Sequence, residues 1–446
     1  MLYYLIRPWV RHLLRSYYRQ IDITGLEHIP ASGPVILAAN HPTAFIEPCI
    51  LACLQRRPLW FLARGNLYKN RLATATLRAL HILPVYRLED GGYGKLRRNY
   101  DTFEECFRSL SRGRAIMILA EGRCIHEKQL RPLRKGTARI AFGALDRDTT
   151  LEDVPVIPVG VNFTAADEPF SRVMIRCGPP ISTKKFLAEY RANEARGIRS
   201  FTRALRDGLT PLIVQHPDPE AAPEGNLYLG MLEQEVPDER GFTHNGQLLD
   251  RQLRGVRAVT DERKDALRRY ALGLREFGVT DREVRDYSAG VGQSRNSAQS
   301  RNSVQSRNSV QSRNSAQSRN GWIPPKSPSW GRTLIALALL LPLLPFYLLA
   351  EYIALRTPAT LEFYSPVRFA ALAVGLLLVA PLLALSFGWW GLLWAVASLL
   401  LYPWAVTQGQ GWTRWQKQRR IQQWQQRRKT LVHLRMSILN TLKEPK

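Results

Sequence analysis

The chain has 446 residues, of which 45% are hydrophobic and 22% charged, and its formal net charge is +26. A chain of this length is too long to fold around a single compact core, so we expect a main domain with additional segments. The charge first suggests nucleic acid, but residues 1–20 carry +4, residues 293–320 carry +5 and residues 412–446 carry +9, together 18 of the 26. Because two of these segments flank apolar sequence, the charge fits an anionic membrane surface, and no nucleic-acid partner is expected.

The cysteines do not have the spacing of zinc ligands, and we expect no metal site. All five lie inside apolar or helical runs, which predicts free thiols in a reducing compartment, at Cys49, Cys53, Cys106, Cys124 and Cys177. The first residues lack the charged stretch and cleavable apolar core of a secretory signal, so no such signal is expected.

Residues 1–20 predict an amphipathic helix. Arginines recur every four residues as one basic stripe, and aromatic and aliphatic residues fill the other side. This pattern is typical of a helix that lies in the bilayer interface. The alternative is a helix that packs its apolar side on the protein core and leaves the basic side in water.

Short β-rich runs alternate with helical patterns from Val35 to about Cys177; the runs are VILAA, LWFLA, ILPVYR, AIMILA, VIPVGV and VMIRC. The alternation predicts an α/β fold with a mostly parallel sheet flanked by helices. We place this main domain at residues 21–225 and a helical extension at residues 226–290.

A six-residue repeat follows, from Gln293 to Asn320. A parallel β-helix of such repeats would need a bulky aliphatic residue in each one, and here only Ala or Val fills that slot. The polar, basic composition instead predicts a disordered linker over residues 291–330.

Two uncharged apolar blocks come next, Thr333–Ala350 and Phe369–Val406. The second would be about 57 Å long as one helix, at ~1.5 Å per residue, whereas the hydrocarbon core of a bilayer is only ~30 Å thick. It must therefore fold back as a hairpin, most simply at Ser386–Gly391. The first block has two prolines, which permit either a membrane span or a re-entrant segment.

Basic residues stand both before and after the second apolar block. Arg356 and Arg368 precede the hairpin and the basic tail of residues 411–446 follows it, so the positive-inside rule places both in the cytoplasm. We therefore expect transmembrane helices within residues 331–410, and an integral protein of the cell membrane whose main domain lies on the cytoplasmic face.

Polar side chains with catalytic potential follow the apolar strands. Asn40 and His41 come directly after VILAA, and Glu47 stands at the start of the next helix. A carboxylate close to an imidazole holds one tautomer and raises its basicity, so that the other ring nitrogen can accept a proton. The alternative is a His–Glu pair that merely caps a helix.

Two later strands end in the same way. Arg87 closes ILPVYR, and Glu121, Gly122 and Arg123 follow AIMILA. Ligands of parallel α/β sheets bind at the carboxyl ends of the strands, so these clusters converge on one edge. Candidate ligands for a phosphate group there are Arg87, Arg123, Arg131, Arg134 and Lys135; the last three are also compatible with ordinary surface charge.

Four stretches carry a family resemblance: NHPTAFIEP, LPVYR, ILAEGR with LRPLRKGTARIA, and VPVIPVGVNF. In order and spacing they resemble the four motifs of the glycerolipid acyltransferases, the family of the glycerol-3-phosphate and 1-acylglycerol-3-phosphate O-acyltransferases. The resemblance covers about Ile23 to Ile181. The apolar hairpin is similar to that of bacterial members related to the fungal glycerol-3-phosphate enzymes.

The resemblance implies roles for individual residues. His41 would be the general base, with Glu47 in the place of the family's Asp and one position further from the histidine than is usual. Arg87 would hold the phosphate of the acceptor, Glu121 and Gly122 would position its glycerol moiety, and Pro158 would line the acyl chain. The expected substrate-binding residues are Asn40, Arg87, Glu121, Gly122, Arg123, Lys135 and Pro158.

The implied protein is a membrane-bound O-acyltransferase of phospholipid biosynthesis. It would transfer a fatty acyl group from an acyl thioester to the hydroxyl of glycerol-3-phosphate or 1-acylglycerol-3-phosphate. Its partners would be membrane lipids, this acceptor and the donor (acyl-CoA or acyl carrier protein, as co-substrate), without a cofactor. The alternatives are an acyltransferase for another lysolipid and a catalytically silent membrane-anchored scaffold of the same fold.

Overall fold

The computed structural model describes residues 1–85, 98–216, 218, 220, 222–237, 239–257, 259, 261–285, 329–356, 361–422 and 425–440. The chain forms two compact units, each assembled from three segments. Unit 1 comprises residues 1–217, 238–254 and 343–378, and unit 2 comprises residues 218–237, 255–342 and 379–446. The predicted repeat, residues 293–320, lies outside the described residues. The units therefore differ from the continuous domains that we expect from the sequence, because patterning along a chain does not show which distant segments pack together.

Unit 1 contains a sheet of eight strands, within the described residues, in the order β4-β3-β5-β2-β6-β7-β1-β8. Every neighbouring pair is parallel except β6 with β7. The central strand β2 is buried along its whole length, as a strand covered on both faces must be. The mostly parallel α/β fold is thereby confirmed. The strands are β1 (Gln20–Thr24), β2 (Val35–Ala39), β3 (Leu59–Arg64), β4 (Ile82–Val85), β5 (Ala115–Leu119), β6 (Val156–Phe163), β7 (Arg172–Cys177) and β8 (Gly241–Thr243).

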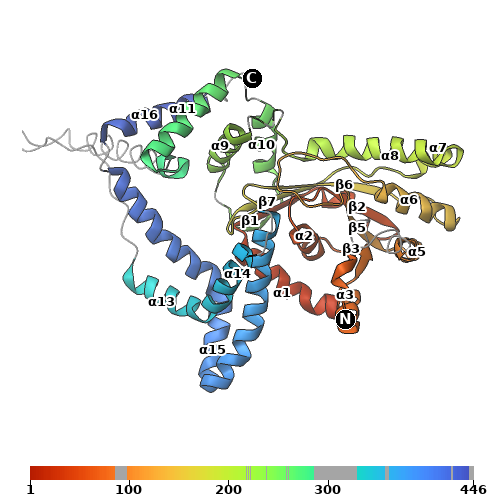
Figure 1. Cartoon of the computed structure of the whole chain (residues 1–446), viewed down its shortest axis with the longest axis horizontal. Coiled ribbons are helices and arrows are strands. Elements are labelled where there is room, and N and C mark those ends of the chain that lie inside the picture. The colour runs from red at the N-terminus through yellow and green to blue at the C-terminus, as the bar shows by residue number, and fades with distance from the viewer. Residues whose placement is uncertain are drawn as a thin grey trace, which may run out of the picture. The chain divides into compact units, whose positions relative to one another are not determined.

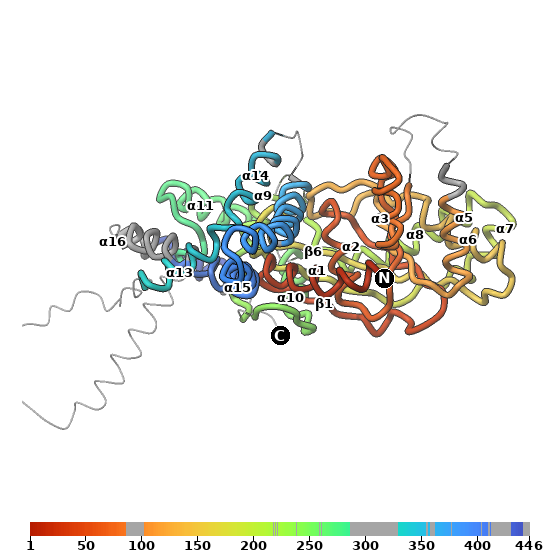
Figure 2. The backbone as a smooth tube through the Cα atoms, turned by 90° about the horizontal axis from the view of Figure 1, so that it is seen from below, coloured from red at the N-terminus to blue at the C-terminus, as the bar shows by residue number. Residues whose placement is uncertain are grey.

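Helices cover both faces of this sheet (Figure 1). On one face lie α5 (Arg98–Ser111), α6 (Gly136–Arg147), α7 (Leu187–Ala192) and α8 (Glu194–Leu209). Their apolar residues form one core with the strands, built from side chains such as Ile36, Ile116, Phe142 and Phe201. On the other face lie α1 (Leu2–Tyr17) and α2 (Ile46–Leu54). The helix α3 (Arg71–Ala79) lies beside the N-terminal end of α1 (Figure 2).

Part of the apolar side of helix α1 packs on protein. That side packs into unit 1, where Tyr3, Leu13, Leu14 and Tyr17 are buried. Part of the arginine stripe also contacts protein, because Arg7 donates to the carbonyls of Cys53 and Gln55 at the end of α2. The exposed apolar residues of α1 lie near its start, at Met1, Tyr4 and Leu5. These contacts bury part of α1, and its contact with a bilayer interface stays a prediction.

Among the described residues, two helices are long and apolar enough to cross a membrane, Trp330–Ile353 and Tyr364–Tyr402. The first consists of α13 (Trp330–Leu340), a short 3-10 turn and α14 (Leu344–Arg356); the second is the start of α15 (Tyr364–Gln422). Within α15, Gly388 has the non-helical angles φ 58° and ψ −138°. A Cβ added to Gly391 would lie 1.9 Å from the backbone oxygen of Leu383, so the chain reverses sharply here. This reversal falls inside Ser386–Gly391, where bilayer thickness predicts it.

Unit 2 also contains a buried ionic cluster. Arg435 of α16 (Gln425–Asn440) pairs with Asp281, 2.9 Å away, and with Glu235, 3.1 Å away. Tyr270 of α11 (Asp261–Phe277) donates to the same Asp281 carboxylate.

The remaining longer helices are α9 (Ala222–Gln234) and α10 (Gln247–Arg257), and the 3-10 helices among the described residues are η1 (Leu26–His28), η2 (Gly65–Leu67), η4 (Lys184–Phe186), η5 (Thr210–Leu212), η7 (Leu341–Leu343) and η8 (Leu361–Phe363).

Candidate active site

The candidate site lies where the strand order of the sheet reverses. After β2 the chain continues to β3 on one side of this strand, and after β5 it continues to β6 on the other side. In open α/β sheets the crevice at such a switch point, outside the carboxyl ends of the strands, is where ligands bind. His41 follows β2 and Glu121 follows the neighbouring β5, so the topology brings the two together as predicted.

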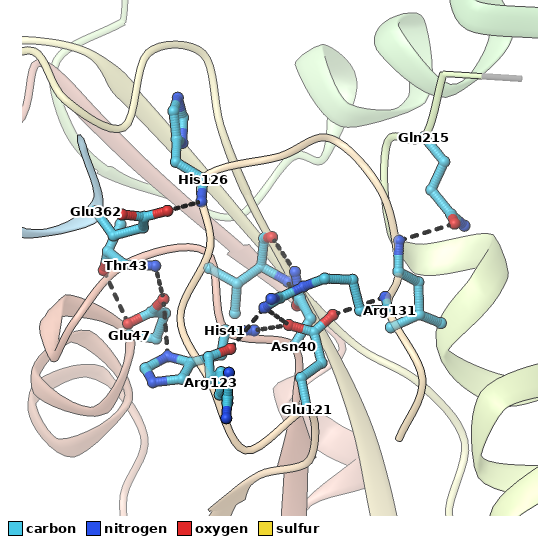
Figure 3. Close-up of polar contacts among 12 residues, drawn as sticks. Asn40, His41, Thr43, Glu47, Glu121, Arg123, His126, Arg131, Gln215 and Glu362 are labelled. Atoms are coloured by element: carbon cyan, nitrogen blue, oxygen red, sulfur yellow. Dashed lines mark hydrogen bonds and ion pairs between the residues drawn. The ribbon is translucent and has the colours of Figure 1, made fainter. Parts of the chain in front are cut away.

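His41 and Glu47 form a buried pair (Figure 3). The Nδ1 atom of His41 lies 3.7 Å from Oε1 of Glu47, and these residues are 7% and 0% exposed. Glu47 stands in the first turn of α2, where the helix dipole favours a negative charge. Its Oε1 accepts a hydrogen bond from the backbone N–H of Thr43 at 2.6 Å, and its Oε2 accepts one from the Thr43 hydroxyl at 2.9 Å. The carboxylate is thus fixed in direction before any substrate arrives.

The geometry of this pair suits proton transfer. Nδ1 of His41 is buried and has no hydrogen-bond partner among the described residues. The carboxylate of Glu47 lies 3.7 Å from it. A distance of 3.7 Å is longer than a hydrogen bond, and catalytic hydrogen bonds are often this loose before substrate binds. A carboxylate on this side favours the tautomer with hydrogen on Nδ1, which leaves Nε2 to accept a proton.

Glu121 holds the backbone of His41. Its Oε2 accepts hydrogen bonds from the His41 N–H at 3.1 Å and from Nη2 of Arg131 at 3.0 Å. Its Oε1 accepts the backbone N–H of Arg131, also at 3.0 Å. The carboxylate therefore helps to join the end of β2 to the β5–α6 loop, which we define as residues 120–135. Both oxygens of this predicted glycerol-binding residue are engaged within the protein.

Asn40 and Gly122 are likewise engaged locally. The side-chain amide of Asn40 donates to the carbonyl of Val161 and accepts its N–H, so it ties the exit of β2 to β6. Gly122 has φ +71°, and a Cβ there would lie 2.9 Å from Cγ of Arg134. A glycine is thus required at this turn for both conformation and space. Asn40 and Gly122 shape the site, and their predicted contacts with substrate stay predictions.

The other predicted binding residues have different surroundings. Arg123 and Lys135 are exposed near the two ends of the β5–α6 loop, and their predicted contact with a phosphate stays a prediction. Pro158 is buried in β6, with its ring packed against Gly178 and against Gly208 of α8. Arg87 lies outside the described residues. The assignment of a phosphate to Arg87 and of an acyl chain to Pro158 stays a prediction.

The structure adds residues that sequence patterns did not single out. The carboxylate of Glu362 accepts the backbone N–H of His126 at 2.9 Å, across 236 positions of sequence. The ring of His126 lies 3.9 Å from Asp167, and burial together with Lys128 lowers the pKa of this histidine. Sequence patterns do not indicate Glu362, because its partner is far away in the sequence. They do not indicate Thr43 either, because a threonine in a polar turn has no distinctive pattern. Among the described residues, no group of three or more His, Cys, Asp or Glu could hold a metal ion.

A buried histidine–carboxylate pair at the switch point of an α/β sheet contains the groups that general-base catalysis uses. Residues 20–162 match the family model described as Acyltransferase. This match and the relatives described next support the glycerolipid acyltransferases as the family of this part of the chain.

Three curated relatives and one solved structure are similar to the chain. Glycerol-3-phosphate O-acyltransferase 1 of Saccharomyces cerevisiae is 27% identical over 48% of this chain and 41% of its own length. A chloroplastic 1-acyl-sn-glycerol-3-phosphate acyltransferase of Brassica napus is 22% identical over 35% of this chain and 41% of its own. An uncharacterised acyltransferase of Schizosaccharomyces pombe is 22% identical over 48% and 44%. The chain thus spans less than half the length of each of these relatives.

The solved structure is the crystal structure of the 1-acyl-sn-glycerophosphate (LPA) acyltransferase PlsC from Thermotoga maritima. It has a TM-score of 0.35 and 17% sequence identity, and the alignment covers 47% of this chain and 79% of that one.

Proposed function

We propose that the protein is a membrane-bound O-acyltransferase that acts on glycerol-3-phosphate or 1-acylglycerol-3-phosphate. The observation that carries the proposal is the buried His41–Glu47 pair at the switch point, inside the matched residues 20–162. The printed names of two relatives, one for each of these acceptors, support the substrate class.

The chemistry follows from the pair. Nε2 of His41 accepts the proton of the glycerol hydroxyl while its oxygen attacks the thioester carbonyl of the acyl donor. Glu47 stabilises the imidazolium that forms, because the carboxylate already faces Nδ1. When the C–S bond breaks, the sulfur leaves with its electron pair and takes up the proton from Nε2. The products are an ester and a free thiol, and neither a covalent enzyme intermediate nor a cofactor is required.

The membrane role rests on the apolar helices. Trp330–Ile353 and Tyr364–Tyr402 have the length and composition to cross a bilayer, and most of their surface is not covered by protein. Basic residues flank them, which favours a cytoplasmic location for the acyltransferase domain. The enzyme would thus receive a water-soluble donor on the same side as its acceptor.

Acyl transfer by the full-length protein in detergent is the direct test. The purified protein is given glycerol-3-phosphate, 1-acylglycerol-3-phosphate and other lysolipids, each with acyl-CoA and with acyl carrier protein as donor, and products are identified by mass spectrometry. His41→Ala should lower kcat by roughly 10²–10⁴-fold, the usual contribution of a general base. The control is His433→Ala, which alters an exposed histidine of unit 2. Full activity of His41→Ala would remove His41 from the mechanism.

A further inference from the structure

A segment from the far end of the chain reaches the β5–α6 loop. Glu362 lies in η8, directly before α15, and it is 7% exposed. Its Oε1 accepts the backbone N–H of His126 at 2.9 Å (Figure 3). A carboxylate that accepts a backbone N–H forms a charge-assisted hydrogen bond, which is stronger than a neutral one.

The segment that carries Glu362 is fixed to unit 1 by other contacts. The hydroxyl of Ser365 lies 2.9 Å from that of Tyr17 at the end of α1, and Ser365 is fully buried. The ring of Phe369 packs edge to face on Tyr17, with centroids 5.5 Å apart. Arg368 donates to the backbone carbonyl of Asp167 at 3.3 Å. Glu362 therefore approaches His126 from a position that residues 365–369 already determine.

The loop residue next to His126 contacts the candidate general base. The backbone N–H of Ile125 donates to the carbonyl of His41 at 3.3 Å. The N–H of His41 in turn donates to Glu121. The backbone of His41 is thus held on both of its polar atoms by the β5–α6 loop, and Glu362 holds the middle of this loop, at His126, which the hydrogen bonds of Glu121 do not reach.

We propose that Glu362 is a positioning residue for the transfer reaction. By holding the backbone at Ile125 and His126, it keeps the His41 imidazole in place beside Glu47, without itself contacting either substrate. A misplacement of about 1 Å in a reacting group can cost roughly 10²-fold in rate, so this distant contact matters for turnover. The inference rests on the proposed function and adds that the segment leading into the apolar helices completes the active site.

Kinetics of three variants of the full-length protein test the proposal. Glu362→Ala should lower kcat by about 10- to 100-fold, with both KM values within about twofold of wild type. Glu362→Gln should stay within about threefold of wild-type kcat, because its amide oxygen can accept the same N–H. The matched control is Glu127→Ala, which removes an exposed carboxylate next to His126 in the same loop. Wild-type kcat in Glu362→Ala, or equal losses in the Ala and Gln variants, would overturn the proposal.

Hydrogen exchange supplies a measurement that does not depend on activity. Backbone amides in the peptide that contains Ile125 and His126 should exchange faster in Glu362→Ala than in wild type or in Glu127→Ala. Unchanged exchange in that peptide would overturn the inference by itself. If wild type transferred no acyl group to any acceptor, the proposed function would fail, whereas the exchange experiment would still decide whether Glu362 holds the loop.

Discussion

Glu47 combines two tasks in one buried carboxylate. It accepts both polar hydrogens of Thr43 and faces Nδ1 of His41 at 3.7 Å. A buried charge is costly unless hydrogen bonds satisfy it, and Thr43 meets that requirement without using the side that faces the imidazole. The turn between β2 and α2 is therefore organised around this side chain.

Two substitutions of Glu47 distinguish the effect of its charge from the effect of its side-chain length. Glu47→Gln should lower kcat by about 10²-fold, because a neutral amide does not stabilise the imidazolium, while Glu47→Asp should retain much more activity since it keeps the charge. Steady-state rates of both variants, with circular dichroism to verify folding, provide the measurement. Wild-type turnover in the Gln variant would mean that His41 works without its carboxylate.

The sequence predicted part of this site. His41 and Glu121 follow apolar strands, and neighbouring parallel strands bring their carboxyl ends to one edge, so their proximity was foreseeable. The engagement of Asn40 with Val161 was not, since it depends on β6 being the neighbour of β2. The contact from Glu362 is invisible in any local pattern.

The helix α1 shows the limit of pattern analysis for whole elements. An apolar stripe opposite a basic stripe has the same periodicity whether it faces lipid or protein. The contacts of α1 with α2 and with Phe369 are tertiary, so this periodicity does not reveal them. The reversal inside α15 was predictable, in contrast, because it depends on the length of the apolar block and the thickness of a bilayer.

The two glycines of that reversal should respond differently to substitution. A Cβ on Gly388 meets no atom within 4 Å, so Gly388→Ala adds only the backbone strain of φ 58° and ψ −138°, about 1–3 kcal/mol. Gly391→Ala places its Cβ against the backbone of Leu383, which cannot yield without opening the turn. Thermal unfolding in detergent should therefore show a far larger loss for Gly391→Ala. Equal losses would show that the close approach at Gly391 relaxes easily.

At the scale of the molecule, unit 1 is discontinuous in sequence. Its sheet uses residues from the first 254 positions, yet residues 343–378 pack on α1 and on the β5–α6 loop. Sequence patterns divide a chain into consecutive stretches, so they assigned these residues to the membrane segments alone. The packing of residues 343–378 on α1 depends on tertiary contacts, such as the one between the hydroxyls of Ser365 and Tyr17.

Two deletions test this organisation. A chain that ends at residue 285 should aggregate or lose activity, because the buried surface around Tyr17 loses the cover of Phe369 and His126 loses its acceptor. Deletion of residues 293–320 should leave activity and folding intact, since the few Ala and Val residues of that polar repeat are too small to form a core. Size-exclusion profiles and transfer rates of both proteins give the answer. A monodisperse, fully active protein ending at residue 285 would contradict the first expectation.

The discontinuity also sets an order of events during synthesis. The strands of unit 1 have all left the ribosome once residue 243 has emerged, but Glu362 emerges more than a hundred residues later, after the apolar stretch Trp330–Ile353. At translation rates of ~5–20 residues per second this interval lasts roughly 5–25 s. During that time the sheet can form while the loop beside His41 lacks its last support. Under the proposed function, a newly made chain would thus gain full activity only after its apolar helices had emerged from the ribosome.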